Sequence, residues 1–373
     1  MLDHFEFLKN LVSIGSATGN FAGVNRVQNL VKQRLETLGF KCELVRNSQH
    51  GSGDLLFGCL NPGGEKALTL VCHADTVFDS TELQVLDVVG DKLVGPGVAD
   101  NKGGITVLLA GLSWYLQKAS TKHCLRVVCS PNEETGSHGY HQLFYDLGEK
   151  SNIILGFEPA TTTGDIIDSR CGNRWYFLES QGREAHAGRA DGEEINAGHD
   201  IVFKIQEILS LKKMYPDLRV NVAKISGGKE RYNIVCGHAS AKIDIRYATT
   251  RTRDEVHQKI IDIVHSPHVR SKDGQIASGT WRMDDDCPPL EPGPMSGYLS
   301  QTYRTLIERL EQTSIAVQFV GGASDVNHFS QKHNASLCGL GPVGGDLHTG
   351  REYVVRSTIE TRGQALAQFL TQI

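Results

Sequence analysis

The chain has 373 residues, of which 39% are hydrophobic and 22% are charged, a composition that is ordinary for a soluble globular protein. This length is long for a single core and predicts two domains. The formal net charge of −5 argues against a general nucleic-acid binder, and no apolar run reaches the roughly 18 residues that cross a bilayer. We therefore expect neither a nucleic acid nor a membrane as a partner.

The cysteines and the N-terminal segment indicate where the protein works. The chain has nine cysteines without a CxxC pattern, and Cys72, Cys129 and Cys236 lie inside apolar runs. Such an odd, unpatterned set is typical of reduced, mostly buried thiols. The opening segment MLDHFEFLKNLVSIGS carries acids where a signal peptide needs bases. We expect a cytoplasmic protein.

The first half of the chain alternates helical and strand patterns. Apolar residues three and four apart between 21 and 39 predict a helix that ends at Gly39. Continuously apolar runs, typical of strands buried on both faces, occur at 67–72, 125–130 and 152–158. Together with a predicted buried helix at 104–119, this alternation predicts an α/β fold with a mostly parallel sheet covered on both sides.

A smaller domain interrupts this pattern. Two predicted helices, at 195–213 and 252–265, lie among four predicted strands at 174–181, 219–225, 232–247 and 275–283. The order β-α-β-β-α-β predicts a ferredoxin-like α+β domain over residues 170–284. It would be inserted into an α/β domain made of residues 1–169 and 285–373, with the acidic residues 284–286 in a solvated hinge.

Residues 93–111, LVGPGVADNKGGITVLLAG, place a glycine-rich turn directly before a helix, an arrangement that often binds phosphate. The Walker pattern fails because Lys102 is followed by Gly103 and Gly104. The GxGxxG pattern also fails, since Asp100 occupies the place of its third glycine. A nucleotide-binding α/β protein is therefore disfavoured, and Asp100 becomes the candidate functional group of the loop.

Acids and histidines follow the predicted core strands or lie in glycine-rich loops: His73, Asp75, Asp100, Glu133, Glu134, Glu158 and His348. Because the carboxyl ends of parallel strands meet at one edge of a sheet, the five carboxylates would share a pocket. Their like charges would repel strongly unless cations neutralised them, and two divalent metals would do so. Imidazole and carboxylate groups suit zinc.

Neighbouring members of this set are expected to divide the work. A His-x-Asp pair at a strand end cannot readily bind one ion with both side chains, so His73 is the expected ligand and Asp75 its supporting partner. Glu133 and Glu134 point in different directions, so that one could bind metal while the other moves protons. Each residue has an ordinary structural explanation alone, but the acids follow strands too apolar for the surface.

Six segments occur in one order along nearly the whole chain: HAD after an apolar strand, GPGVADNKGG, PNEETG, GFEPA, GREAHAG and LHTGREYV. In this combination the chain resembles the M20 family of dinuclear zinc peptidases and deacylases, and within it the glutamate carboxypeptidase type. Any one of these segments would be a weak signal, whereas the set is highly specific.

The resemblance implies a complete centre with two zinc ions per subunit, Co²⁺ or Mn²⁺ being alternatives. It assigns five metal ligands: the bridging Asp100, His73 and Glu158 on one ion, and Glu134 and His348 on the other. It also implies that Glu133 is the general base for the water between the ions and that Asp75 supports His73. Relatives have a cis peptide after the equivalent aspartate, which implies one between Asp100 and Asn101.

The resemblance further implies a group of substrate-side residues. His186 from GREAHAG would polarise the scissile carbonyl, and in dimeric relatives it comes from the partner subunit. Asn233 and Arg246 match positions that bind the carboxylate end of the substrate. The segment GGASD at 321–325 matches a glycine loop on the substrate side, with Gly322 and Ser324 as its binding residues.

Two positions depart from the family pattern. Cys287, ahead of Pro288, stands where several relatives have an arginine that grips the substrate carboxylate, so the resemblance leaves a strict glutamate preference open. Ala323 replaces the usual third glycine of the substrate-side loop, a lesser change.

Together, the residues and the resemblance predict a metallopeptidase that hydrolyses an amide or peptide bond in a small substrate with a free carboxylate end. Release of a C-terminal amino acid such as glutamate is the expected reaction, and an N-acyl-amino-acid deacylase or a dipeptidase is the alternative. A metal-binding scaffold that has lost catalysis is disfavoured because no ligand or base is missing. Relatives often form a homodimer through the inserted domain, so we expect one here.

Overall fold

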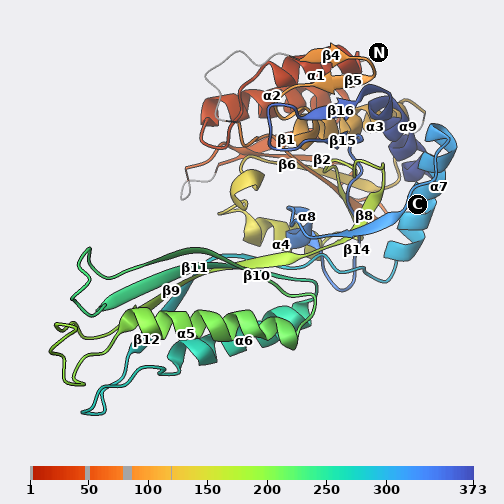
Figure 1. Ribbon diagram of the computed structural model, residues 1–373. Coiled ribbons are helices and arrows are strands. Elements are labelled where there is room, and N and C mark those ends of the chain that lie inside the picture. The colour runs from red at the N-terminus through yellow and green to blue at the C-terminus, as the bar shows by residue number, and fades with distance from the viewer. Residues whose placement is uncertain (1–2, 47–50, 79–85, 119) are drawn as a thin grey trace. The chain divides into compact units, whose positions relative to one another are not determined.

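The computed structural model describes residues 3–46, 51–78, 86–118 and 120–373 (Figure 1). The chain divides into two units. The first consists of Met1–Arg170, Leu290–Val320 and Ser324–Ile373, and the second of Cys171–Pro289 and Gly321–Ala323.

A six-stranded sheet with the order β1-β2-β6-β3-β7-β14 forms the centre of the first unit. Its strands are β1 (Lys41–Val45), β2 (Leu55–Leu60), β3 (Ala67–His73), β6 (Cys124–Ser130), β7 (Ile153–Gly156) and β14 (Ala335–Leu337). The four strands β6, β3, β7 and β14 pair in parallel, and β1 and β2 add antiparallel strands at one side. This arrangement confirms the predicted α/β fold with a mostly parallel sheet.

Helices cover both faces of this sheet because its side chains alternate between two cores. Leu68, Leu70 and Cys72 of β3 belong to the larger core, whereas Val71 belongs to the smaller one. The larger core is completed by α1 (His4–Val12), α2 (Phe21–Thr37), α3 (Gly104–Lys118), α7 (Ser296–Glu311) and α9 (Arg356–Gln372). The smaller core is completed by α4 (His141–Glu149) and α8 (Val326–Phe329).

Two small sheets complete the first unit. β8 (Ile166–Arg170) pairs in parallel with β13 (Val317–Val320). The other has the order β15-β16-β5-β4, from β4 (Asp87–Val89), β5 (Lys92–Val94), β15 (Gly344–Gly345) and β16 (Tyr353–Val355). β5 lies just before the glycine-rich loop, and β15 and β16 flank the segment that contains His348. The pairing of β16 with β5 therefore brings two distant candidate segments together.

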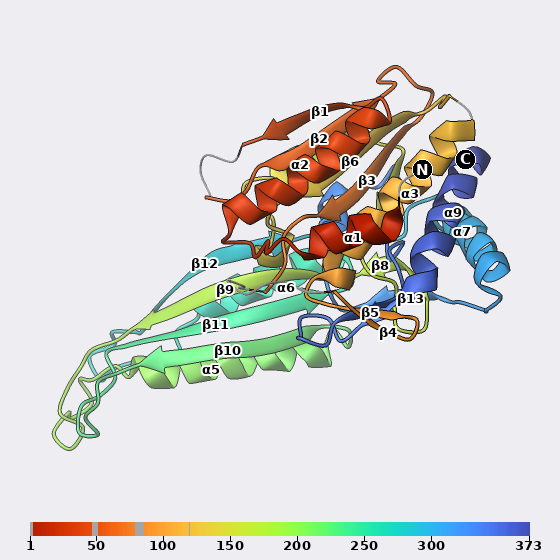
Figure 2. The same ribbon diagram turned by 90° about the horizontal axis from the view of Figure 1, so that it is seen from above.

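The second unit is an antiparallel sheet with two helices. Its strands are β9 (Gly172–Gln181), β10 (Arg219–Gly227), β11 (His238–Tyr247) and β12 (Ser278–Cys287), in the order β10-β11-β9-β12 (Figure 2). The helices α5 (Ala197–Ser210) and α6 (Thr250–His265) share one hydrophobic core with this sheet. The chain order β-α-β-β-α-β confirms the predicted ferredoxin-like arrangement.

The predicted hinge at residues 284–286 is wrong. These residues lie within β12, where Asp285 and Asp286 pair with Trp175 and Arg174 of β9. Asp286, whose side chain is 35% exposed, accepts a hydrogen bond of 2.7 Å from Nε of Arg174, so a neighbouring strand supplies the partner of its charge. The second unit accordingly continues to Pro289, beyond the expected boundary at residue 284.

Within the described residues, no helix has the length and apolar character that a membrane span requires. The cytoplasmic location stays a prediction.

Candidate metal centre

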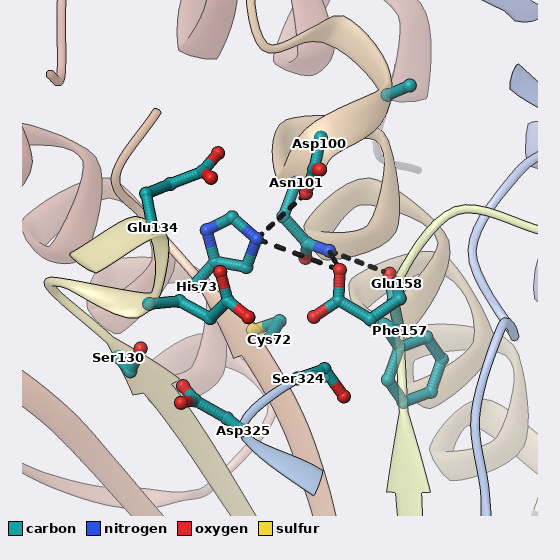
Figure 3. Close-up of polar contacts among 12 residues, drawn as sticks. Cys72, His73, Asp100, Asn101, Ser130, Glu134, Phe157, Glu158, Ser324 and Asp325 are labelled. Carbon is teal, nitrogen blue, oxygen red and sulfur yellow. Dashed lines mark hydrogen bonds and ion pairs between the residues drawn. The ribbon is translucent and has the colours of Figure 1, made fainter. Parts of the chain in front are cut away.

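The side chains of six of the seven acids and histidines expected at the sheet edge are linked by direct contacts in the first unit. Figure 3 shows four of them, His73, Asp100, Glu134 and Glu158. His73, the last residue of β3, is the centre of the group. Its Nε2 atom lies 2.9 Å from Oδ1 of Asp100 and 3.8 Å from Oε2 of Glu158, which follows β7. Its side chain is 1% exposed, so these polar groups interact away from bulk water.

Asp100 lies between two histidines. While Oδ1 faces His73, Oδ2 lies 3.3 Å from Nε2 of His348, and that nitrogen lies 3.3 Å from Oε2 of Glu134. His73, Asp100 and Glu134 each offer a ligand atom within 4.8 Å of the others. A carboxylate with one oxygen towards each histidine is the arrangement that a bridging ligand between two ions requires.

The pKa values of these groups reflect strong pairing between the histidines and the carboxylates. Hydrogen bonds to Asp100 and Glu134 raise the pKa of His348 to about 10. Burial opposes ionisation of Asp100, but hydrogen bonds from His348 and His73 lower the pKa of its carboxyl below the usual range. The second oxygen of Glu134, Oε1, is buried without a hydrogen-bond partner. Oxygen and imidazole donors gathered around an unsatisfied buried carboxylate fit divalent metal ions.

Asp75 does more than support His73. Its Oδ1 lies 3.3 Å from Nδ1 of His73 and accepts the backbone N–H of Glu133 at 3.0 Å. Its Oδ2 accepts the N–H of Glu134 at 3.2 Å and the hydroxyl of Thr18 at 2.7 Å. One fully buried carboxylate therefore fixes the end of β3 relative to the turn that follows β6.

Glu133 has the properties of a group that holds a proton. Burial raises the pKa of its carboxyl well above the usual range, and the negative charges of Glu158, Asp325 and Asp100 raise it further against the opposing effect of His73. An elevated carboxyl pKa near a reaction centre is typical of a general base that works close to neutral pH.

The glycine-rich loop brings Asp100 to this position. The peptide bond between Asp100 and Asn101 is cis, as the resemblance implied. Asn101 donates to the carbonyl of Phe157 at 3.0 Å and to Oε2 of Glu158 at 3.3 Å. A Cβ at Gly104 would lie 2.0 Å from the carbonyl oxygen of Phe157, so this glycine allows the loop to approach the end of β7.

Comparisons with known proteins agree with this geometry. The sequence matches peptidase family M20/M25/M40 over residues 69–372. The chain belongs to this family. Its members are hydrolases that act on peptide or amide bonds, and this chain is therefore a hydrolase of the same kind.

Individual relatives cover nearly the whole chain. Carboxypeptidase G2 from Pseudomonas sp. is 26% identical over 98% of this chain and 88% of its own length. Succinyl-diaminopimelate desuccinylase from Alkalilimnicola ehrlichii is 24% identical over 97% of this chain and 96% of its own. The YXEP protein of Bacillus subtilis, a dinuclear metal binding peptidase from the M20 family, shares the fold with a TM-score of 0.71 and 13% identity. That comparison covers 99% of this chain and 97% of the YXEP chain.

The residues that the resemblance assigns to the substrate side lie mainly in the second unit. His186 and Asn233 are exposed and adjacent, with His186 Nε2 3.5 Å from Asn233 Nδ2. Arg246, on β11, lies 3.1 Å from Asp244 of the same strand. Gly322 belongs to the second unit and the buried Ser324 to the first.

Sequence reasoning missed two buried acids of the first unit. Asp325 accepts a 2.5 Å hydrogen bond from Oγ of Ser137, and burial raises the pKa of its carboxyl to about 6. Glu352 accepts hydrogen bonds from the backbone of the Asp100 loop. Both lie inside segments that carried the resemblance, GGASD and LHTGREYV, so an acid within a family segment was the available signal.

Proposed function

We propose that this M20 hydrolase is a metal-dependent carboxypeptidase that releases a C-terminal amino acid, such as glutamate, from a small substrate with a free carboxylate end. The position of Asp100, with one carboxylate oxygen towards each of two histidines, is the observation that carries the proposal. The metal proposed is Zn²⁺, with Co²⁺ or Mn²⁺ as substitutes. Asp100 would bridge two ions, with His73 and Glu158 on one and Glu134 and His348 on the other.

Two bound ions would polarise the scissile carbonyl and lower the pKa of a shared water. Glu133 would accept a proton from the attacking water and give it to the leaving amine. Asp75 would keep the imidazole of His73 in the tautomer that leaves Nε2 free to bind metal. His186 would donate a hydrogen bond to the oxygen that becomes negative during attack.

The free carboxylate of the substrate requires a cationic or amide partner. We propose Asn233 and Arg246 for this role, together with Gly322 and Ser324 from the substrate-side loop. Arg246 already interacts with the carboxylate of Asp244 and could exchange that partner for a substrate. Cys287 stands where several relatives have an arginine that grips the substrate carboxylate. If this chain prefers an amino acid other than glutamate, the residues around the carboxylate end of the substrate would be the cause.

An N-acyl-amino-acid deacylase is the second candidate, because a succinyl-diaminopimelate desuccinylase is among the relatives that cover nearly the whole chain. Three substrates separate the candidates: an acyl-glutamate, an N-acetyl amino acid and a dipeptide. The carboxypeptidase proposal predicts that kcat/KM is highest for the first. It also predicts that converting the free carboxylate to an amide abolishes most of the activity. Equal hydrolysis of the amide contradicts a carboxypeptidase.

We also propose a homodimer formed through the second unit. Helix α5 exposes the large apolar side chains of Val202, Phe203 and Leu209, and β10 is an edge strand. Phe203→Glu should shift the mass measured by light scattering from a dimer towards a monomer, whereas Tyr298→Glu, at an exposed position in the first unit, should not. A wild-type monomer across the accessible concentrations contradicts the proposal.

A further inference from the structure

Glu352 is a fully buried acid four residues after His348. It belongs to neither set of expected ligands, and it precedes β16 directly. Burial of a charged carboxylate requires compensating partners. The partners of Glu352 therefore show what this side chain does.

The side chain of Glu352 binds the backbone that leads into Asp100. Its Oε1 atom accepts the N–H of Ala99 at 2.8 Å and the N–H of Asp100 at 3.0 Å. The backbone of Gly97 also hydrogen-bonds to this carboxyl. In addition, the main-chain carbonyl of Glu352 accepts the N–H of Gly95 at 3.0 Å. One residue thus holds the loop at several points between 95 and 100.

The same residue is tied to the loop that carries His348. The N–H of Glu352 donates to the carbonyl of Thr349 at 3.1 Å, and the hydroxyl of Thr349 donates to the carbonyl of Asp346 at 2.7 Å. These bonds form a tight turn between His348 and Glu352. The distance between the loops of Asp100 and His348 is therefore set through Glu352.

Burial disfavours the charged forms of both Glu352 and a neighbouring lysine, because it raises the pKa of the Glu352 carboxyl to about 7 and lowers the pKa of the Lys102 ammonium to about 7. Lys102 is fully buried, its Nζ donates to the carbonyl of Ile14 at 2.9 Å, and it interacts electrostatically with Glu352. Lys102 lies within the loop, two residues after Asp100, and neither Lys102 nor Glu352 is among the expected ligands. The Oε1 atom of Glu352 can accept the backbone N–H groups whether or not the carboxyl is ionised, and its Oε2 atom is buried without a hydrogen-bond partner.

We propose that Glu352 is a positioning residue of the metal centre, which fixes the backbone of Asp100 so that its carboxylate faces His73 and His348 together. The inference rests on the proposed metal centre. The hydrogen bonds, which need the full length of a glutamate side chain, carry this role. Groups that orient metal ligands typically change metal affinity by about 10–100-fold when they are removed.

Two substitutions separate the effect of the length of the Glu352 side chain from the effect of its charge. Glu352→Gln keeps an acceptor oxygen at the same distance but removes the charge, whereas Glu352→Asp keeps the charge but is one methylene too short. Glu311→Gln is the matched control, because Glu311 is also an acid of the first unit, its side chain is only 9% exposed, and it pairs with Arg362, away from the candidate ligands.

The experiment titrates each metal-free protein with Co²⁺ and follows visible absorption, while circular dichroism verifies the fold. We expect two equivalents bound by the wild type and by Glu311→Gln. Glu352→Asp should bind Co²⁺ about 10–100-fold more weakly with an altered spectrum, and Glu352→Gln should lose less than about tenfold.

Equal affinity and equal spectra of wild type and Glu352→Asp overturn the inference, and so does a weaker Co²⁺ affinity of Glu352→Gln than of Glu352→Asp. A wild type that binds no Co²⁺ would instead overturn the proposed metal centre, so the two failures are distinguishable.

Discussion

The two units hold their candidate functional residues under opposite conditions. In the first unit, His73 and Asp75 are almost completely buried and contact one another at the ends of core strands. In the second unit, His186 and Asn233 are exposed, and the contact between their side chains is a weak one of 3.5 Å. The chemistry of the first group is set by the fold, whereas the second group can change without disturbing a core.

This difference predicts which substitutions change metal binding and which change the choice of substrate. The centre of the first unit is connected by hydrogen bonds in which most groups have more than one partner, so that few substitutions are neutral. Exposed loop residues tolerate substitution more readily. We therefore expect substitutions at the candidate residues of the first unit to change metal binding or turnover. Substitutions at those of the second unit should change kcat/KM more for some substrates than for others.

The largest effect is expected from Glu133→Gln. This change keeps the size of the side chain but removes the group that would accept the proton of water, so kcat should fall by about 10²–10⁴-fold. Metal content, measured by elemental analysis, should remain at the wild-type level because Glu133 is not an expected ligand.

Glu149→Gln, at the end of α4, is the matched control and should keep wild-type turnover. If Glu133→Gln retained activity within a few-fold of wild type, the base would have to be another residue.

His186→Ala tests the second unit directly. The loss of one hydrogen-bond donor to a developing oxyanion typically lowers kcat by about 10²–10³-fold. Metal content and thermal stability should not change, since His186 is exposed and lies outside both hydrophobic cores of the first unit. An altered metal content would contradict a role confined to the substrate.

Mixing His186→Ala chains with Glu133→Gln chains then tests which subunit His186 serves. Recovery of part of the activity indicates that it acts on the partner subunit in a dimer. Activity that stays at the sum of the two inactive proteins indicates action within its own chain.

The strands of the first unit were predicted well because strands buried on both faces are continuously apolar in sequence. The runs at 67–72 and 125–130 are apolar without alternation, and the corresponding strands β3 and β6 are buried on both faces. Acids directly after such strands must lie at the sheet edge, so the positions of His73 and Glu133 followed from local sequence alone.

Contacts between distant segments were not predictable in this way. The acids at 284–286 indicated a hinge because nothing in the local sequence shows that Arg174, more than a hundred residues earlier, pairs with Asp286. For the same reason Glu352 was missed, since its partners Ala99 and Asp100 are 253 and 252 residues away in sequence. The cis peptide after Asp100 was expected only from the resemblance.

Asp75→Asn should have an intermediate effect that is confined to the first unit. The carboxylate accepts the backbone N–H groups of both Glu133 and Glu134, and an amide can provide an oxygen to only one of them. We expect metal affinity to fall by about 10–100-fold, as competition with a chelator would measure.

Asp54→Asn, at a half-buried surface acid, is the matched control for Asp75→Asn. Wild-type metal affinity and wild-type turnover in Asp75→Asn would contradict the role assigned to this carboxylate.

The smallest effect concerns the pH dependence of metal binding. Because Asp100 and Glu134 raise the pKa of His348 to about 10, the metal-free protein holds a proton on this imidazole at neutral pH. A metal ion must displace that proton, since only neutral imidazole binds metal. Apparent metal affinity should therefore rise with pH below about 10, by about tenfold per pH unit for each proton released.

Calorimetry in buffers of different ionisation enthalpy counts these protons, and His348→Ala should release about one fewer than wild type. Equal proton release from the two proteins would mean that His348 is already neutral before metal binds, and that the contacts between His348 and the two acids are weaker than their 3.3 Å distances indicate.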